Sequence, residues 1–138
     1  MTPNVRQTVP LLNVTNITAS LAFYVDGLGF SMANQWTPEG HVRWCWLELG
    51  TAAIMLQEYW RDGQPGGVPA GTLGLGVSVC FQCADALAIY HEVTPRGIAA
   101  AKPLVSNGLW DVALTDPDGY HLHFASPTDV PENTVYAG

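Results

Sequence analysis

The apolar positions along the chain follow one order of elements twice. Leu21, Tyr24 and Leu28 recur on one helix face in the first half, and Leu87 and Tyr90 do so in the second. These patterns predict two helices, at residues 18–28 and 84–93. Apolar stretches separated by glycine-containing turns predict strands at residues 8–14, 30–37, 42–49, 52–60, 74–82, 98–105, 109–115 and 120–126. Each half therefore has the order strand, helix and three strands.

The two halves also share residues, because the LAFY of residues 21–24 matches the LAIY of residues 87–90. One helix covers one face of a four-stranded sheet and leaves the other face open. Two open faces can enclose a groove, so we expect a single α+β domain that forms an open-groove pseudo-barrel. Its expected parts are module one at about 8–60, a Gly- and Pro-rich linker at 61–73, module two at about 74–126 and a loose tail at 127–138.

Composition narrows the possible partners of this fold. Of the 138 residues 48% are hydrophobic and only 12% are charged, which is typical of a folded chain and excludes disorder. The formal net charge of −7 disfavours binding to a phosphate backbone, so we expect no nucleic acid partner. A neutral or cationic partner suits this charge better.

The sequence also predicts the cellular compartment of the protein and the redox state of its cysteines. The longest stretch without charge, residues 63–84, is interrupted by glycines and prolines, so we expect no membrane span. The N-terminal residues show no apolar signal segment, which predicts a cytoplasmic protein. Three cysteines are an odd number, and reduced thiols are the simplest interpretation. Cys80 and Cys83 have the C-x-x-C spacing, but the first lies in a strand, so we expect two small buried residues.

Three stretches carry a resemblance to a known family. They are VTNITASLAFY at residues 14–24, GLGF at 27–30 and DPDGYHLHF at 116–124. The chain over residues 8–126 resembles the vicinal-oxygen-chelate superfamily, which includes glyoxalases, extradiol dioxygenases and bleomycin-resistance proteins. The start around Val9 and the end around His123 look most like the bleomycin-resistance branch. That resemblance implies antibiotic resistance by a homodimer that sequesters a cationic, aromatic drug in apolar clefts at its interface, without chemistry.

The resemblance also bears on a metal site. It places the four metal-ligand positions of the family on Val9, Leu56, Val77 and His123, and three of these side chains are apolar. A catalytic ion needs about three protein ligands, so we expect no metal cofactor. A shift of two residues along the strands keeps the same faces and leaves an alternative open. In that alternative one divalent ion is held by Gln7, Glu58, His121 and His123.

Aromatic residues predict where a ligand binds. Trp44 and Trp46 share one face of a strand and form a stacking platform for a flat molecule, or else belong to the core or a dimer seam. Glu58 is a candidate counter-ion for a cationic ligand. The further expected ligand-binding residues are Leu56, Val77, Val79, Trp110, His121 and His123. The DPDG of residues 116–119 looks like a hairpin turn instead of a catalytic group.

These observations predict a small-molecule binding protein with no catalytic residues, whose ligand is an apolar or cationic organic molecule. The alternative is a metal-dependent enzyme of the same superfamily: a glyoxalase-type lyase or isomerase, a dioxygenase or a thiol transferase. A third possibility is a purely structural module that binds a partner protein, which a filled groove would favour. The ligand positions separate the first two, because a metal enzyme needs coordinating side chains there.

Overall fold

The computed structural model describes residues 3–59 and 68–138. Module one holds β1 (Leu11–Val14), α1 (Ile17–Leu21), the π-helical η1 (Ala22–Gly27), β2 (Ser31–Trp36), the 3-10 turn η2 (Pro38–Gly40), β3 (Trp44–Leu49) and β4 (Ala52–Glu58). Module two holds β5 (Ser78–Gln82), α2 (Ala86–Val93), the 3-10 turn η3 (Thr94–Arg96), β6 (Leu104–Ser106), β7 (Leu109–Thr115) and β8 (His121–Pro127). The predicted repeat of strand, helix and three strands is confirmed.

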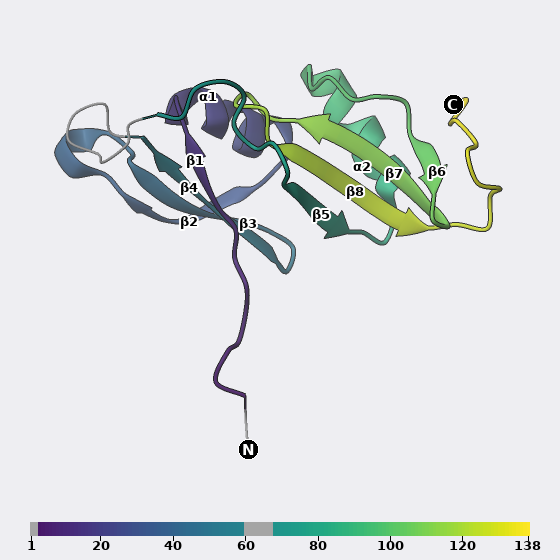
Figure 1. Cartoon of the computed structure of the whole chain (residues 1–138), viewed down its shortest axis with the longest axis horizontal. Helices are drawn as coiled ribbons and strands as arrows, with labels where there is room; N and C mark the ends of the chain where they lie inside the picture. The colour runs from purple at the N-terminus through teal and green to yellow at the C-terminus, as the bar shows by residue number, and fades with distance from the viewer. Residues whose placement is uncertain (1–2, 60–67) are drawn as a thin grey trace.

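Each module forms a four-stranded mixed sheet with the same topology. The strand orders are β1-β4-β3-β2 and β5-β8-β7-β6. In both modules the first strand pairs in parallel with the last, and the remaining pairs are antiparallel. The two sheets lie side by side along the long axis of the molecule, with the helices behind them in the view of Figure 1. The α+β class and the two-module architecture are as predicted.

Local sequence explains where the helices begin. Asn16 caps α1, because its side chain accepts a hydrogen bond from the backbone N–H of Ala19 at 3.1 Å. Asp85 caps α2 in the same way through Ala88. The first helix continues as the π-helical η1 through Gly27, close to the predicted end of the helix.

The core forms where the helices pack on one face of each sheet and where the modules meet. The Phe30 ring of module one lies 5.9 Å from the Phe81 ring, which stacks on Phe124 at 4.7 Å. The buried Tyr24 hydroxyl donates a hydrogen bond to the Asp116 carboxylate at 2.8 Å across the same junction. Phe81, Phe124 and Tyr24 thus join both modules into one hydrophobic core.

The carboxylate of Asp116 also confirms the predicted turn. It accepts hydrogen bonds from the backbone N–H groups of Asp118 and Tyr120, each at 2.9 Å. Gly119 closes the turn with a φ of 95°, a left-handed conformation that suits glycine. The DPDG stretch therefore shapes the backbone and holds the module junction.

Both ends of the chain differ from expectation. The first strand begins at Leu11 instead of residue 8, and the described residues before it form an arm that projects from the body in Figure 1. The prediction of a loose tail is wrong, because Val135 forms an isolated β-bridge with Leu104 on the edge of β6. The Tyr136 ring also packs 5.6 Å from that of Trp110. This backbone bridge and this ring contact hold the tail, whose composition alone gives no such signal.

Two further predictions concern the bounds of a strand and of the linker. The strand predicted at residues 98–105 is reduced to β6, with one isolated bridge between Ala100 and Leu114 before it. The linker predicted at residues 61–73 falls partly outside the described residues, which resume at Val68. Within the described part of the chain, no helix is long and apolar enough to cross a membrane.

Candidate functional site

The open face of sheet two is polar. On β5 the side chains of Ser78, Cys80 and Gln82 alternate with Val79 and Phe81, and the register pairs Cys80 with His123 of β8. Leu122 and Phe124 of β8 are buried toward α2, so their neighbours in the strand face away from the helix. The open face therefore carries hydroxyl, thiol, amide and imidazole groups.

Two adjoining hollows lie on this face, and both include His123. One of about 310 Å³ is lined by Ser78, Cys80, Gln82, Ser106, Asn107, Leu109, Asp111, His123 and Ala125. The other, of about 540 Å³, is lined by Ala99, Ala100, Ala101, Ala113, Leu114, Thr115, His121 and His123. His121 and His123 share one face of β8 as predicted, and their role in binding stays a prediction.

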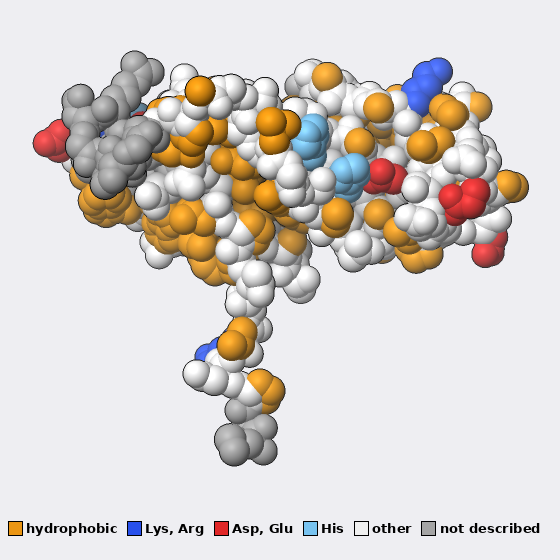
Figure 2. Space-filling model, in the orientation of Figure 1, with side chains coloured by type: hydrophobic (Ala, Val, Ile, Leu, Met, Phe, Trp, Pro, Cys, Tyr) orange, Lys and Arg blue, Asp and Glu red, His pale blue; other side chains and the backbone are white. Residues whose placement is uncertain are grey.

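His123 is held in place by Asp111 of β7. Its Nδ1 lies 3.0 Å from each carboxylate oxygen of Asp111, and both side chains are about one-third exposed. A carboxylate accepts hydrogen bonds, so Nδ1 carries the proton and Nε2 has a lone pair when the ring is neutral. Figure 2 shows two histidine side chains beside an acidic one near the middle of this surface.

The open face of sheet one is aromatic instead. Trp44 and Trp46 share it as predicted, because Cys45 between them and Leu47 after them are fully buried on the opposite face. Trp46 Nε1 donates a hydrogen bond to Glu48 Oε2 at 3.1 Å. The register adds further residues to this face: Leu11, Asn13, Asn34, Trp36, Met55 and Gln57. Leu11 and Trp36 are among the exposed large apolar side chains of the molecule.

Two predicted groove residues of β4 lie on the wrong face for a ligand. Leu56 is completely buried in the core, and Glu58 is only 9% exposed on the same side of the strand. Met55 and Gln57 face outward in their place, each paired with a tryptophan of β3. The prediction for Leu56 is wrong because a strand face shifts completely with a register error of one residue.

Glu58 has a structural task. Its carboxylate accepts a hydrogen bond from the backbone N–H of Ile17 at 2.8 Å, and it contacts Arg43 at 2.8 Å and His41 at 2.7 Å. Burial alone would raise the pKa of Glu58, but the Ile17 hydrogen bond, His41 and Arg43 outweigh it and lower the pKa. The predicted role as counter-ion for a ligand is therefore wrong.

The predicted site residues Val79 and Trp110 also face the core side. Val79 packs against the hydrophobic core, and Trp110 pairs with the buried Ser126 and contacts the tail. Val77 lies just before β5 and is 54% exposed, outside the pairing of the strand. The structure therefore does not bring Val79 or Trp110 to an open face.

The alternative metal set is not assembled within one chain. Glu58 is buried under α1, Gln7 lies in the projecting arm, and His121 and His123 occupy the open face of sheet two. Among the residues that the structure describes, no group of three His, Cys, Asp or Glu side chains is placed to hold a metal ion. Within one chain these four residues therefore do not form a site for a divalent ion.

Sequence reasoning missed Cys80, Asp111 and Gln82. Cys80 is exposed, which contradicts the prediction of a buried thiol. The sequence did contain a signal for Cys80 and Gln82. Along this strand the polar residues Ser78, Cys80 and Gln82 alternate with apolar ones. Such a strand turns its apolar side toward the helix, which places the polar side on the open face.

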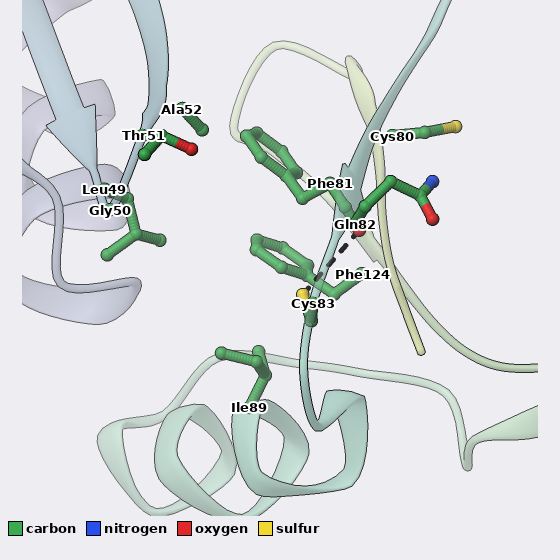
Figure 3. Close-up of a pocket in the computed structure, with 10 residues that line it drawn as sticks. All are labelled: Leu49, Gly50, Thr51, Ala52, Cys80, Phe81, Gln82, Cys83, Ile89 and Phe124. Atoms are coloured by element: carbon green, nitrogen blue, oxygen red, sulfur yellow. Dashed lines mark hydrogen bonds between the residues drawn. The ribbon is translucent and has the colours of Figure 1, made fainter. Parts of the chain in front are cut away.

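A third hollow, of about 390 Å³, lies where the β3–β4 turn meets β5 and α2. Figure 3 shows Phe81, Phe124 and Ile89 directed into it, with Leu49 and Ala52 on the opposite wall. Cys83 donates a weak hydrogen bond to the Phe81 carbonyl at 3.6 Å. This hollow belongs to the module junction and lies on the core side of β5.

Comparison with known proteins agrees with this fold. The model of the Glyoxalase/Bleomycin resistance protein/Dioxygenase superfamily matches residues 6–124. No curated protein matches the chain. One similar structure is the bleomycin resistance determinant encoded on the transposon Tn5, with 23% identity, a TM-score of 0.68 and coverage of 91% of this chain and 100% of that one.

Two further structures show the range of proteins with this fold. TnmS3, an antibiotic binding protein from Streptomyces sp. CB03234, has 23% identity and a TM-score of 0.64, and the match covers 89% of this chain and 98% of that one. A lactoylglutathione lyase from Agrobacterium tumefaciens has 17% identity and a TM-score of 0.65, covering 91% and 96%. At these identities the likeness supports the fold and leaves function to the residues of the site.

Proposed function

Because the chain belongs to the glyoxalase/bleomycin resistance protein/dioxygenase superfamily, we propose that it binds a small organic molecule and performs no metal-dependent chemistry. The observation that carries this proposal is the aromatic open face of sheet one, where Trp44 and Trp46 stand half-buried beside Glu48. Similar structures include an antibiotic binding protein and a bleomycin resistance determinant, which supports this class of function.

The proposed ligand is flat and either apolar or cationic. Side chains two residues apart on a strand stand about 7 Å apart, so Trp44 and Trp46 offer adjacent ring surfaces for stacking. Contact of a cation with an aromatic face contributes about 0.5–2 kcal/mol. The carboxylates of Glu48 on sheet one and Asp111 on sheet two replace Glu58 as the acidic groups near such a ligand.

We further propose that two copies of the chain form the complete binding groove. The two sheets of one chain lie side by side, so the open face of one module is not covered by the other (Figure 1). Exposed apolar side chains, including Leu11, Trp36 and Leu104, support burial against a second copy. A stable dimer buries at least about 1,000 Å² in total. Light scattering that returns the 14.8 kDa monomer mass at high concentration would contradict it. A cytoplasmic location stays a prediction.

Fluorescence quenching tests the binding proposal. We expect bleomycin, a planar cationic dye such as ethidium, or a neutral polycycle such as pyrene to quench tryptophan emission at micromolar concentration. The double substitution W44A/W46A should weaken binding at least tenfold. Trp110→Ala is the matched control, because Trp110 lies on the core side of β7 and packs on the tail.

Two results would overturn the proposal. One is that no probe of the three quenches at 100 μM. The other is that binding survives unchanged in W44A/W46A, which would assign both tryptophans to a protein interface. Metal analysis of the purified protein tests the alternative, because one firmly bound divalent ion per chain would favour an enzyme.

A further inference from the structure

We propose that Cys80, His123 and Asp111 form a nucleophilic thiol site, and that it captures ligands carrying an electrophilic carbon–carbon double bond. These ligands are α,β-unsaturated carbonyl compounds, which a thiol converts to a thioether. The assignment of this ligand class rests on the proposed function, because the thiol stands on an open face of the binding groove. The site itself stands on the arrangement of three side chains from three adjacent strands.

The thiol and the imidazole lie next to each other on the open face. Cys80 of β5 and His123 of β8 are direct partners in the parallel register, and neighbouring strands lie about 4.8 Å apart. Both side chains line the hollow of about 310 Å³. Figure 3 shows Cys80 directed away from Phe81 and Phe124, on the side opposite the core.

Asp111 orients the imidazole for this task. It stands on β7, which flanks β8 on the side opposite β5, and it binds Nδ1 of His123. The second ring nitrogen, Nε2, lies across the ring and points away from Asp111. In the order thiol, imidazole, carboxylate, the imidazole acts as the base that takes the proton of the nucleophile. The carboxylate then stabilises the resulting imidazolium.

The other two thiols lack this setting. Cys45 is completely buried in the core, and burial raises its pKa to about 11. Burial also raises the pKa of Cys83, whose sulfur donates to the Phe81 carbonyl. Since the thiolate is the reactive form, both groups should react slowly near neutral pH. They serve as internal controls within the same molecule.

The proposed reaction balances without an oxidant or reductant. The Cys80 thiol proton passes to Nε2 of His123 as the sulfur bonds to the β-carbon of the alkene. The π electrons of the double bond move toward the carbonyl and form an enolate. The imidazolium then returns its proton to the α-carbon. The net result is the addition of S–H across the double bond, with no leaving group and an unchanged His123.

N-ethylmaleimide, an activated alkene, tests the site in the full-length reduced protein. The adduct at each cysteine is followed over time at pH 7 by peptide mass spectrometry. We expect a first adduct on Cys80, formed at least tenfold faster than that on Cys83. His123→Gln should slow labelling of Cys80 about tenfold or more, without changing labelling of Cys83; general-base catalysis typically contributes about 10²–10⁴-fold. Asp111→Asn should produce a smaller loss in the same direction.

The buried Cys45 reports whether a variant is folded, because its labelling requires unfolding. Equal rates at Cys80 and Cys83 in the wild type would overturn the thiol site. An unchanged ratio of the two rates in folded His123→Gln would overturn it as well. The outcome is separate from that of the binding proposal, since quenching by ethidium involves no covalent step. Quenching without selective labelling refutes the thiol site alone, and selective labelling without quenching refutes the aromatic binding face alone.

Discussion

The open faces of the two sheets differ although their backbones repeat one topology. Sheet one presents the indole rings of Trp44 and Trp46. Sheet two presents Cys80, His123 and Asp111 at the corresponding side of its own strands. The faces that pack on the helices differ less, since most of their side chains are apolar in both sheets. A repeated module therefore keeps its core-facing residues apolar while its open face is free to acquire different chemistry, aromatic in one copy and polar in the other.

The comparison rests on which residues of a strand face the core, and the clearest test is in β5. Phe81→Ala removes a ring that packs on Phe30 and Phe124, so we expect a loss of about 3–5 kcal/mol in the free energy of unfolding. Cys80→Ala changes an exposed side chain, so it should change the free energy of unfolding by no more than about 0.5 kcal/mol. Urea unfolding measures both. Similar losses in the two variants would contradict the assignment of faces in sheet two.

The matching test in sheet one uses neighbours on β4. Leu56→Ala empties a fully buried position and should cost about 2–5 kcal/mol. Met55→Ala lies on the open face and is partly exposed, so we expect less than half of that loss. If Met55→Ala is the more destabilising variant in urea, then the strand presents Leu56 to the groove after all.

Two buried carboxylates, one in each module, should respond to pH in opposite directions. The folded-state pKa of Glu58 is lowered, so its stabilising effect is present above the ordinary pKa near 4.5 and is lost as pH falls through the lowered value. The stability gap between wild type and Glu58→Gln should therefore shrink on acidification. Urea unfolding at several pH values between 3 and 7 measures this gap, and a constant gap would contradict the ion-pair assignment.

For Asp116 we expect the opposite dependence of stability on pH. Burial raises its pKa above 3.8 despite hydrogen bonds from Tyr120, Tyr24 and Asp118 that lower it. The folded state therefore favours the protonated form, and stability is lost as pH rises through the raised value. Relative to Asp116→Asn, the wild type should be most stable at low pH. The same urea series measures this difference, and an opposite slope would show that the hydrogen bonds to Asp116 outweigh its burial.

The smallest expected effect concerns the exposed hydrogen bond on sheet one. Trp46→Phe keeps an aromatic ring and removes the Nε1 donor to Glu48, so the free energy of unfolding should change by less than about 0.5 kcal/mol. Dye affinity should fall only slightly, because stacking remains. A large loss of affinity in a fluorescence titration would show that the indole N–H or Glu48 contacts the ligand.

The sequence was sufficient for the fold and for one open face. The spacing of Leu21 and Tyr24, repeated at Leu87 and Tyr90, predicted both modules. On β3 the tryptophans were assigned correctly from their alternation alone. On β4 the alternation of polar and apolar residues gives no signal, since Met55 is as apolar as Leu56. The resemblance to the family assigned Leu56 to the open face, one residue from Met55, which lies there.

The pair of Asp111 and His123 could not be predicted for a different reason. The two residues are far enough apart in sequence to lie on separate strands, and they meet only through the register of β7 with β8. Strand register depends on turn geometry and on packing against the helix, which local patterns do not report. Cys80 joins them through a parallel pairing whose partner strands are distant in the chain.

The ordered tail has a consequence for how the chain can associate with itself. The backbone N–H of Val105 donates to the Thr134 carbonyl at 3.0 Å and that of Tyr136 to the Pro103 carbonyl at 2.8 Å, so the outer edge of β6 is occupied. In the described chain the other edge strands of the two sheets are β1, β2 and β5. The tail thus closes the β6 edge to strand addition by another copy. An edge strand that its own chain already pairs cannot serve as a template for edge-to-edge aggregation, so the last residues of the chain protect this edge of sheet two.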